Sequence, residues 1–512
     1  MKAYNRLLYV MAFAKLVLPF LLQNSFYEPH RDEFLYLAEG RHMAWGFMEV
    51  PPLLSVFAWL IHICGGGMFW IKFWPSLFGA FNFIIVGKII LSLGGKSFAL
   101  LLGFLPFVLD VYLRTNFLFQ PNFLEIFFWT LIAWSMISFI QTQQNKWLYI
   151  FGISLGMGMM SKYSVSIFAI SILLGILLTP HRKIFTNKHF YAACVLAFLI
   201  FLPNLLWQYN HHFPVVFHMK ELQKTQLQYI SPAGFLIDQL MMNLPCVFTW
   251  ITGLCWISFS RNTKQYRFLG WAYVLVIALL LISHGKNYYS LGVYPTLFAF
   301  GAYRLEQLTA VRFKFIRYTC IAFAVCIAYL FIPIALPLFE PAKLAAFYEK
   351  NRVEKTGALK WEDLKNHPLP QDFADMLGWE EMTKKMAAAY NTLDSNEKKR
   401  SILFCDNYGQ AGAVNYYGNK YKLPQANSDN ASFLYWMPAN PDFDNIVLLT
   451  DDGHEMEHAF IKNFKSAVLS DSVTSIYARE RGSLIIILKG ADETFKKFFL
   501  EKIEKDKAKV NL

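Results

Sequence analysis

Apolar segments of bilayer-crossing length recur from the N-terminus to about residue 339 and do not recur after it. A transmembrane helix needs roughly 17–25 mainly apolar residues, and several of these segments are at the lower limit. The pattern therefore predicts a polytopic α-helical membrane protein with about eleven spanning helices, plus or minus about two. We expect them near residues 7–22, 71–92, 97–112, 122–141, 147–160, 163–179, 189–206, 235–257, 268–283, 289–304 and 315–338.

A different pattern begins after the last apolar segment. Residues 400–409, 444–453 and 482–492 are short apolar runs that end in turn residues, and residues 379–393 have helical periodicity. Strands interleaved with helices indicate a small soluble α/β domain. We therefore divide the chain into a transmembrane module, 1–339, and a C-terminal α/β domain, 340–512.

The composition supports a membrane protein. Of 512 residues, 55% are hydrophobic and 17% aromatic, and only 16% are charged, which is unusual for a soluble protein. The seven cysteines show no disulfide framework and no metal-ligand spacing. We predict no required cofactor and no metal site, although His30, His42 and the acids near them are residue types that can bind a divalent cation.

The positive charge of the chain follows its predicted topology. Lys and Arg exceed Asp and Glu by 12, and the excess lies in every second connection between the apolar segments. By the positive-inside rule the N-terminus is cytoplasmic, so the first long loop, 23–70, and the C-terminal domain lie outside. The excess of positive charge is thus explained by membrane topology and does not indicate nucleic-acid binding. The basic connections contain Lys2 and Arg6; Lys96; Lys146; Arg182, Lys183 and Lys188; Arg261, Lys264 and Arg267; and Arg312, Lys314 and Arg317.

Three cations lie on the outer side, against this bias: Arg114, Lys162 and Lys286. One interpretation is that each reaches lipid phosphates in general from a helix end. The other is that they bind the phosphate of one specific lipid headgroup. Their aromatic neighbours, Tyr163 and the pair Tyr288 and Tyr289, suit such a phosphate site or a membrane-interface belt equally well.

Two further charges have less certain partners. Lys15 lies in the middle of the first apolar segment, where an unpaired charge is costly, and no partner is evident in the sequence. Glu125 begins the fourth segment on the outer side, and we expect it to be the counter-ion of Arg114.

The first outer loop is unusually rich in charge. Residues 26–53 read FYEPHRDEFLYLAEGRHMAWGFMEVPPL, an amphipathic stretch that predicts one or two short helices along the membrane interface. Asp32 and Glu33 are adjacent and cannot share one helical face, so at most one of them points at a given substrate. Such carboxylates are either solvated loop charges or a general base for a reaction at the membrane surface.

This loop resembles the first outer loop of bacterial glycosyltransferase family 39 and aminoarabinose-transferase-like proteins, of the GT-C superfamily. Further segments of the chain are similar to recurrent segments of that group, and their order and spacing strengthen the resemblance. They are GMGMMSKYSV (156–165), LPNLLWQYNHHFP (202–214), GKNYYSLGVYP (285–295), FADMLGWEEM (373–382) and NYGQAGAVNYYG (407–418). The last one follows a predicted strand, and its glycines suit a phosphate cradle or a tight strand-to-helix turn.

The resemblance implies a GT-C fold and transfer of a sugar from a polyprenyl phosphate to an acceptor hydroxyl, with inversion. By position, Asp32 matches the expected catalytic base and Glu49, before Pro51-Pro52, matches the second acidic position. Glu33 is then expected to orient the acceptor or the loop. The implied partners are an undecaprenyl-phosphate-type donor, a glycan, lipid or protein acceptor, and the lipids of a bacterial inner membrane.

The chemistry agrees with these residue types. An acceptor hydroxyl is a weak nucleophile until a carboxylate within hydrogen-bond reach takes its proton. A lipid phosphate leaves as an anion, so the site needs cations at that position. Two other classes remain open from the sequence: a lipid or sugar transporter, although we see no internal repeat, and a scaffold or receptor, which would leave the acidic loop unexplained.

Overall fold

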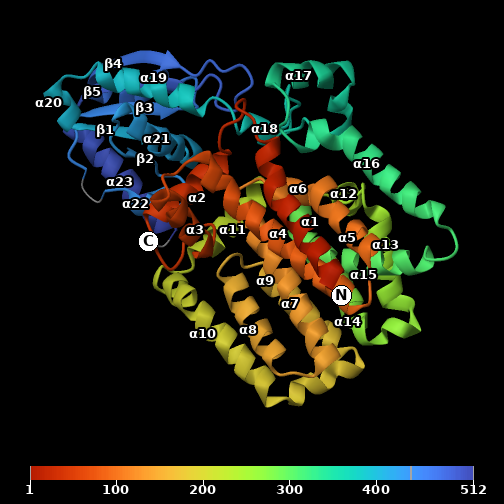
Figure 1. Cartoon of the computed structure of the whole chain (residues 1–512). Coiled ribbons are helices and arrows are strands. Elements are labelled where there is room, and N and C mark those ends of the chain that lie inside the picture. Colours follow the sequence, from red (N-terminus) through yellow and green to blue (C-terminus); the bar gives the residue numbers. More distant parts are fainter. Residues whose placement is uncertain (1, 439–440, 511–512) are drawn as a thin grey trace.

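A computed structural model describes residues 2–438 and 441–510 as a helical body joined to a small sheet (Figure 1). Within these ranges six helices are long and apolar enough to cross a membrane. They are α1 (Lys2–Leu22), α4 (Met68–Ser92), α7 (Asn122–Thr142), α10 (Lys188–Asn210), the continuous stretch Arg261–Ile282 that includes α14 (Arg267–Ile282), and α16 (Phe315–Ala335). A seventh is counted if α9 (Val165–Leu177) and the turn Pro180–Thr186, bent by 112°, form one span.

The expected number of about eleven spans is therefore not confirmed, although each predicted segment is mostly helical. The others fold as shorter helices: α5 (Ser97–Leu109), α8 (Lys146–Met159), α12 (Pro232–Met241), α13 (Val247–Phe259) and α15 (Tyr294–Leu308). The segment 235–257 is divided between α12 and α13, because Pro245 in the intervening turn cannot donate a helical hydrogen bond. Hydropathy alone does not register such breaks.

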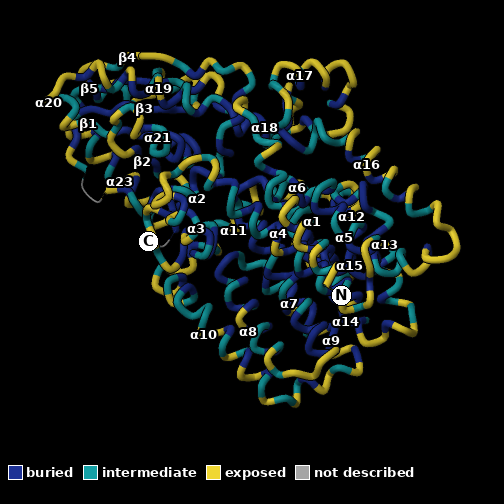
Figure 2. Tube along the Cα trace, in the orientation of Figure 1, coloured by how far each residue is buried: buried dark blue, intermediate teal, exposed yellow. Residues whose placement is uncertain are grey.

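Close helix packing holds the body together. A Cβ atom at Gly301 of α15 would lie 1.7 Å from the carbonyl oxygen of Thr249 in α13, and one at Gly253 would lie 2.1 Å from that of Leu297. Small residues at such crossings are typical of membrane helices, where backbones approach closely. Burial differs between the spanning helices (Figure 2). Of the apolar stretch of each helix, 78% is buried in α7, but only 22% in α1 and in α10 and 17% in α16.

The C-terminal region contains a five-stranded sheet in the order β2-β1-β3-β5-β4. Strand β1 pairs in parallel with β2 and β3, and β5 pairs antiparallel with β3 and β4. The expected small α/β sheet is confirmed. The strands are β1 (Ser401–Cys405), β2 (Ala426–Asn427), β3 (Asn445–Thr450), β4 (Phe464–Ser472) and β5 (Leu484–Ala491).

Helices cover both faces of this sheet. One face packs α19 (Trp379–Asn391) and α21 (Tyr408–Tyr421) through alternating side chains such as Leu403 and Val447. The other packs α23 (Glu493–Lys509) through side chains such as Phe404 and Ile446. The alternation along β1 and β3 follows the two-residue period of a strand buried on both faces.

The first outer loop contains two helices, α2 (Arg31–Arg41) and α3 (Leu53–Ile63), as its amphipathic pattern predicts. Helix α2 does not lie on an open interface, however, because its apolar side chains Phe34, Leu35 and Ala38 pack into the core of the C-terminal region. In Figure 1, α2 and α3 lie between the sheet region and the helices of the body. The loop is therefore the junction of the two parts.

Short elements complete the chain. They are α6 (Val111–Thr115), α11 (Pro214–Thr225), α17 (Pro341–Lys350), α18 (Gln371–Ala374), α20 (Ser395–Lys399) and α22 (Phe433–Trp436), with 3₁₀ turns at Leu227–Tyr229, Arg261–Tyr266, Asn287–Val293, Val353–Thr356, Glu455–Glu457 and Ala459–Asn463.

Candidate active site

A cavity of about 960 Å³ lies where the helical body, the first outer loop and the C-terminal region meet. Seven of the nine residues that the sequence singles out line it, and they come from four separate stretches of the chain. They are Asp32, Glu49, Lys162, Tyr163, Lys286, Tyr288 and Tyr289. Glu33 and Arg114 do not line it.

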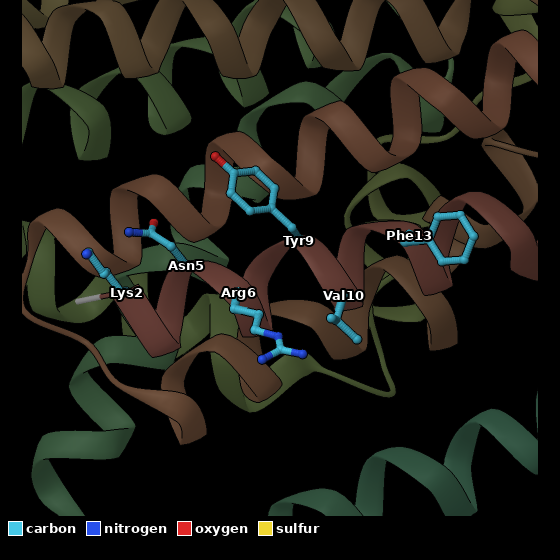
Figure 3. A pocket seen from close by; sticks show the side chains of 6 residues that line it. All are labelled: Lys2, Asn5, Arg6, Tyr9, Val10 and Phe13. Atoms are coloured by element: carbon cyan, nitrogen blue, oxygen red, sulfur yellow. The ribbon is translucent and has the colours of Figure 1, made fainter.

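A second hollow, of about 610 Å³, lies along the outside of α1 (Figure 3). Its lining side chains all belong to this one helix, and none of them is acidic: Lys2, Asn5, Arg6, Tyr9, Val10 and Phe13. It offers no proton acceptor, so the chemistry of the chain is better sought in the larger cavity.

Asp32 lies at the start of α2, where the His30 side chain caps the helix by accepting the Asp32 backbone N–H at 3.1 Å. The two carboxylate oxygens of Asp32 accept hydrogen bonds from the Tyr408 hydroxyl at 2.7 Å and from the Gln120 amide at 3.2 Å. Burial alone would raise the pKa of Asp32, but the hydrogen bond from the Tyr408 hydroxyl and nearby positive charge, including Arg31, hold it below the ordinary value. Asp32 is thus an oriented carboxylate, ionised at neutral pH.

Glu33 has a different environment, fully buried behind the cavity. It accepts the backbone N–H of His30 at 2.8 Å and that of Phe119 at 2.6 Å, and the Lys72 ammonium lies 3.1 Å away. With its oxygens occupied in this way, Glu33 fixes α2 against α4. Of the two expected alternatives, this placement favours orientation of the loop.

Glu49 faces the cavity and accepts the Ser432 N–H at 2.9 Å and the Ser432 hydroxyl at 2.5 Å. Burial raises the pKa of Glu49 to about 7, so this carboxyl changes charge near neutral pH. The neighbouring Glu39 is fully buried, and burial together with Glu49 raises its pKa well above the ordinary value. Glu39 therefore holds its proton more tightly than an exposed glutamate does.

The cation Lys162 is paired inside the cavity. Its ammonium donates to Asn122 at 2.8 Å and to Glu125 at 2.6 Å, and it lies 4.3 Å from the centre of the Tyr289 ring. The expectation that Glu125 pairs with Arg114 is wrong. Glu125, in the first turn of α7, pairs with Lys162, whereas Arg114, on α6, pairs with Asp372 of α18.

Lys286 lines the same cavity as Lys162. Among the described residues it has no ion pair, and its ammonium lies 6.0 Å from the centre of the Tyr288 ring. Burial lowers the pKa of Lys286 below its ordinary value. His218 of α11 lines the same cavity, and burial and the charge of Lys286 lower its pKa to about 4, so the imidazole is neutral.

The remaining sequence candidates take structural partners. The Tyr163 hydroxyl donates to Asn204 at 3.1 Å and accepts from Gln208 at 2.9 Å, which ties the cavity wall to α10. Lys15, which had no evident partner, is fully buried and donates to the backbone carbonyl of Tyr112 at 3.4 Å.

Sequence reasoning missed Tyr408 and Ser432, the hydroxyl partners of Asp32 and Glu49. Tyr408 does lie in the glycine-rich segment 407–418, which begins at the N-cap of α21 directly after β1 and makes up most of that helix. A Cβ atom at Gly409 would lie 2.5 Å from the Arg31 side chain, and one at Gly412 would lie 2.7 Å from Phe34. These glycines allow α21 to approach α2, so the structure favours the strand-to-helix turn over a phosphate cradle.

Two groups of side chains have the spacing of metal ligands within the described residues. One joins His30 with Asp372 and Asp375, and the other, on the exposed surface, joins Asp452, Glu455 and His458. In the first group the Nδ1 atom of His30 already accepts a backbone N–H, so the neutral ring carries its hydrogen on Nε2, which then has no lone pair for a metal. Asp372 and Asp375 are also paired with arginines. We assign no metal to either group.

Known proteins are similar to this chain in sequence pattern and in fold. Residues 49–207, less than half of the chain, match the family model described as dolichyl-phosphate-mannose-protein mannosyltransferase. The crystal structure of ArnT from Cupriavidus metallidurans bound to undecaprenyl phosphate is similar over 95% of this chain and 97% of that one, with 12% sequence identity and a TM-score of 0.59. The chain has a GT-C fold.

A second GT-C structure is also similar. The archaeal oligosaccharyltransferase AglB from Archaeoglobus fulgidus, in complex with an inhibitory peptide and a dolichol-phosphate, aligns over 89% of this chain and 70% of that one, with 13% identity and a TM-score of 0.50. The resemblance recognised in the sequence is thereby confirmed. A search of curated protein sequences gave no match.

Proposed function

We propose that the chain is a membrane glycosyltransferase that moves a sugar from a polyprenyl-phosphate donor to an acceptor hydroxyl. The observation that carries this proposal is the cavity, which combines an oriented carboxylate, Asp32, with Lys162 and Lys286 in one space. Similarity to a GT-C protein bound to undecaprenyl phosphate supports the same donor class.

In the proposed reaction the acceptor hydroxyl loses its proton to Asp32 as its oxygen attacks the anomeric carbon. The bond from that carbon to the phosphate oxygen breaks, and the lipid phosphate leaves with the electron pair. A single displacement of this kind inverts the anomeric centre. General-base catalysis lowers the barrier for attack, and positive charge at the phosphate stabilises the leaving group.

The roles of the other residues follow from their contacts. Lys286 and Lys162 neutralise the phosphate, and Lys286 has the larger share because Glu125 already balances Lys162. Tyr288 and Tyr289 line the phosphate end of the cavity beside these lysines. Glu49 binds a hydroxyl of the sugar or acceptor, whereas Arg114, occupied by Asp372, is left out of the proposed site.

The alternating basic connections support an external C-terminal region and an active site on the outer face of a bacterial inner membrane. The acceptor class, whether glycan, lipid or protein, is left open by the cavity residues. The rival function is a lipid or sugar transporter, which would move the donor across a bilayer without breaking its glycosidic bond.

Transfer itself decides between these functions. Purified protein in detergent, given a labelled polyprenyl-phosphate sugar and a mixture of envelope acceptors, is expected to release free polyprenyl phosphate and label an acceptor. Asp32→Asn keeps the shape of the side chain and removes the proton acceptor, so turnover should fall by about 10²- to 10⁴-fold. Donor binding should be largely preserved. Unchanged turnover by Asp32→Asn would rule out Asp32 as the base, and flipping without transfer would favour a transporter.

A further inference from the structure

The two cavity carboxylates of the first outer loop, Asp32 and Glu49, take hydroxyl hydrogen bonds from the C-terminal region. Tyr408 donates to Asp32 across 376 residues of sequence, and Ser432 donates to Glu49 across 383. Lys162 and Lys286, in contrast, lie on the helical body, and the third lysine of the cavity, Lys509, belongs to α23. Asp32 and Glu49 are thus held by side chains of the C-terminal region, whereas the two lysines singled out in the sequence belong to the body.

The Tyr408 side chain is itself firmly placed. The Arg31 guanidinium lies 4.5 Å from the centre of its ring, and the Asn430 side chain accepts its backbone N–H at 3.3 Å. The close approach of α21 to α2 at Gly409 leaves no space for a larger residue beside Arg31. The hydroxyl of Tyr408 therefore reaches Asp32 from a rigid helix start and not from a loose loop.

Ser432 is placed with similar precision. It is fully buried, and its hydroxyl oxygen also accepts the backbone N–H of Met48 at 3.1 Å. Together with its own N–H bond to Glu49, this ties the part of the first outer loop between α2 and α3 to the segment before α22. The second carboxylate therefore depends on the C-terminal region as much as the first does.

We propose that the C-terminal region completes the active site, with Tyr408 as a positioning residue for Asp32 and Ser432 as a positioning residue for Glu49. This inference rests on the proposed function, in which Asp32 is the base. Donors from Tyr408 and Gln120 occupy one lone pair on each oxygen of Asp32 and prevent the carboxylate from rotating. The remaining lone pairs then point at the acceptor, which is the condition for efficient proton transfer.

The same hydrogen bond helps to keep Asp32 ionised. Several charged or titratable groups face Asp32, and Tyr408 is the one that contributes a direct hydroxyl bond. The groups are His30, Arg31, Tyr36, Lys286, Tyr288, Asp375 and Tyr408. Because the Tyr408 bond lowers the pKa of Asp32, its removal raises that pKa and moves the acidic limb of the turnover profile to higher pH.

The test is Tyr408→Phe in the full-length protein, with Tyr416→Phe as a matched control. Tyr416 lies on the same helix, and its hydroxyl makes a bond of similar length, 2.9 Å, to the Gly66 carbonyl outside the cavity. We expect Tyr408→Phe to lower kcat by roughly tenfold to a hundredfold. The KM for the donor should be unchanged, and the acidic limb of the pH profile of turnover should move to higher pH. Tyr416→Phe should leave all three unchanged.

Two further variants make the result decisive. If Tyr408 acts through Asp32, Tyr408→Phe should not lower kcat any further in a protein that already carries Asp32→Asn, because the effects of coupled residues are not additive. Ser432→Ala should raise the pH at which Glu49 ionises, since the hydroxyl bond lowers the pKa of that carboxyl. Wild-type kcat and pH profiles for both Tyr408→Phe and Ser432→Ala would overturn the inference. Full activity of Asp32→Asn would instead overturn the proposed function.

Discussion

Lys286 and Lys162 line the same cavity, but they differ in charge balance. Glu125 lies 2.6 Å from Lys162, whereas Lys286 has no ion pair among the described residues. A charge-assisted hydrogen bond is worth roughly 1.5–3 kcal/mol. Lys286→Met should therefore weaken binding of undecaprenyl phosphate by about tenfold to a hundredfold.

The matched comparison is the double variant Lys162→Met with Glu125→Gln, which removes a nearly neutral pair without leaving a buried charge. We expect it to bind undecaprenyl phosphate more tightly than Lys286→Met does. Equal losses, measured by titration of the purified proteins, would mean that the two lysines share the phosphate evenly.

Glu49 gives the cavity a pH-dependent charge. Its pKa is raised from 4.5 to about 7 by burial, so the folded state holds this proton more tightly than the unfolded state does. Stability should therefore fall as the pH rises through that window, by up to about 1.4 kcal/mol for each unit of pKa shift. The groups that face Glu49 are Tyr36, Glu39, Ser432 and Tyr435.

Glu49→Gln removes this titration. Its melting temperature relative to wild type should rise between pH 5 and pH 8, while its transfer activity falls because a cavity carboxylate is lost. Glu39→Gln should change in the same direction, because the pKa of Glu39 is also raised on folding. A melting difference between Glu49→Gln and wild type that does not vary with pH would contradict the assignment.

Among the helices, α2 is held in place against α4 by one buried ion pair. Glu33 and Lys72, which join α2 to α4, are both almost completely buried. Removing one partner of a buried pair typically costs about 3–5 kcal/mol because the other charge is left unpaired. Glu33→Gln should therefore lower the melting temperature markedly, whereas Glu39→Gln on the same helix should not.

If Glu33 fixes the loop, the folded fraction of Glu33→Gln keeps the KM of the wild type for the donor. A normal melting temperature with lost turnover would place Glu33 in the chemistry and not in the support of α2. The two outcomes are separated by measuring thermal unfolding and transfer on the same preparation.

The sequence anticipated helices better than spans. Most of each apolar segment is helical, but length and apolarity together select six helices within the described residues. The break at Pro245 and the 112° bend after α9 depend on local geometry that a hydropathy average does not detect. In the C-terminal region, short apolar runs between turn residues did identify β1, β3 and β5.

For the whole molecule, topology is the first prediction to test. The alternating basic loops place the N-terminus inside and the C-terminal region outside. A reporter that is active only outside the cytoplasm, fused after residue 340, should be active. Activity of a cytoplasm-only reporter at the same point would reverse the topology and move the cavity to the inner face.

The cavity shows which parts of a site are visible in sequence. Lys162 and Lys286 stood out because they oppose the charge bias of the loops, and Asp32 and Glu49 because the loop resembles a known family. Tyr408 and Ser432 carried no comparable signal, since a tyrosine after a strand and a serine in a loop are common. Their importance comes from contacts across 376 and 383 residues, which only the folded chain brings together.

Those long-range contacts also set an order of events during biosynthesis. Asp32 and Glu49 leave the ribosome early, while the last third of the chain is still unmade, because chains fold from the N-terminus as they are produced. Tyr408 and Ser432 follow only when the sheet region has been made. A nascent chain therefore contains both acids before the side chains that position them exist. If the proposed function is right, unfinished or truncated copies would bind the lipid donor without consuming it.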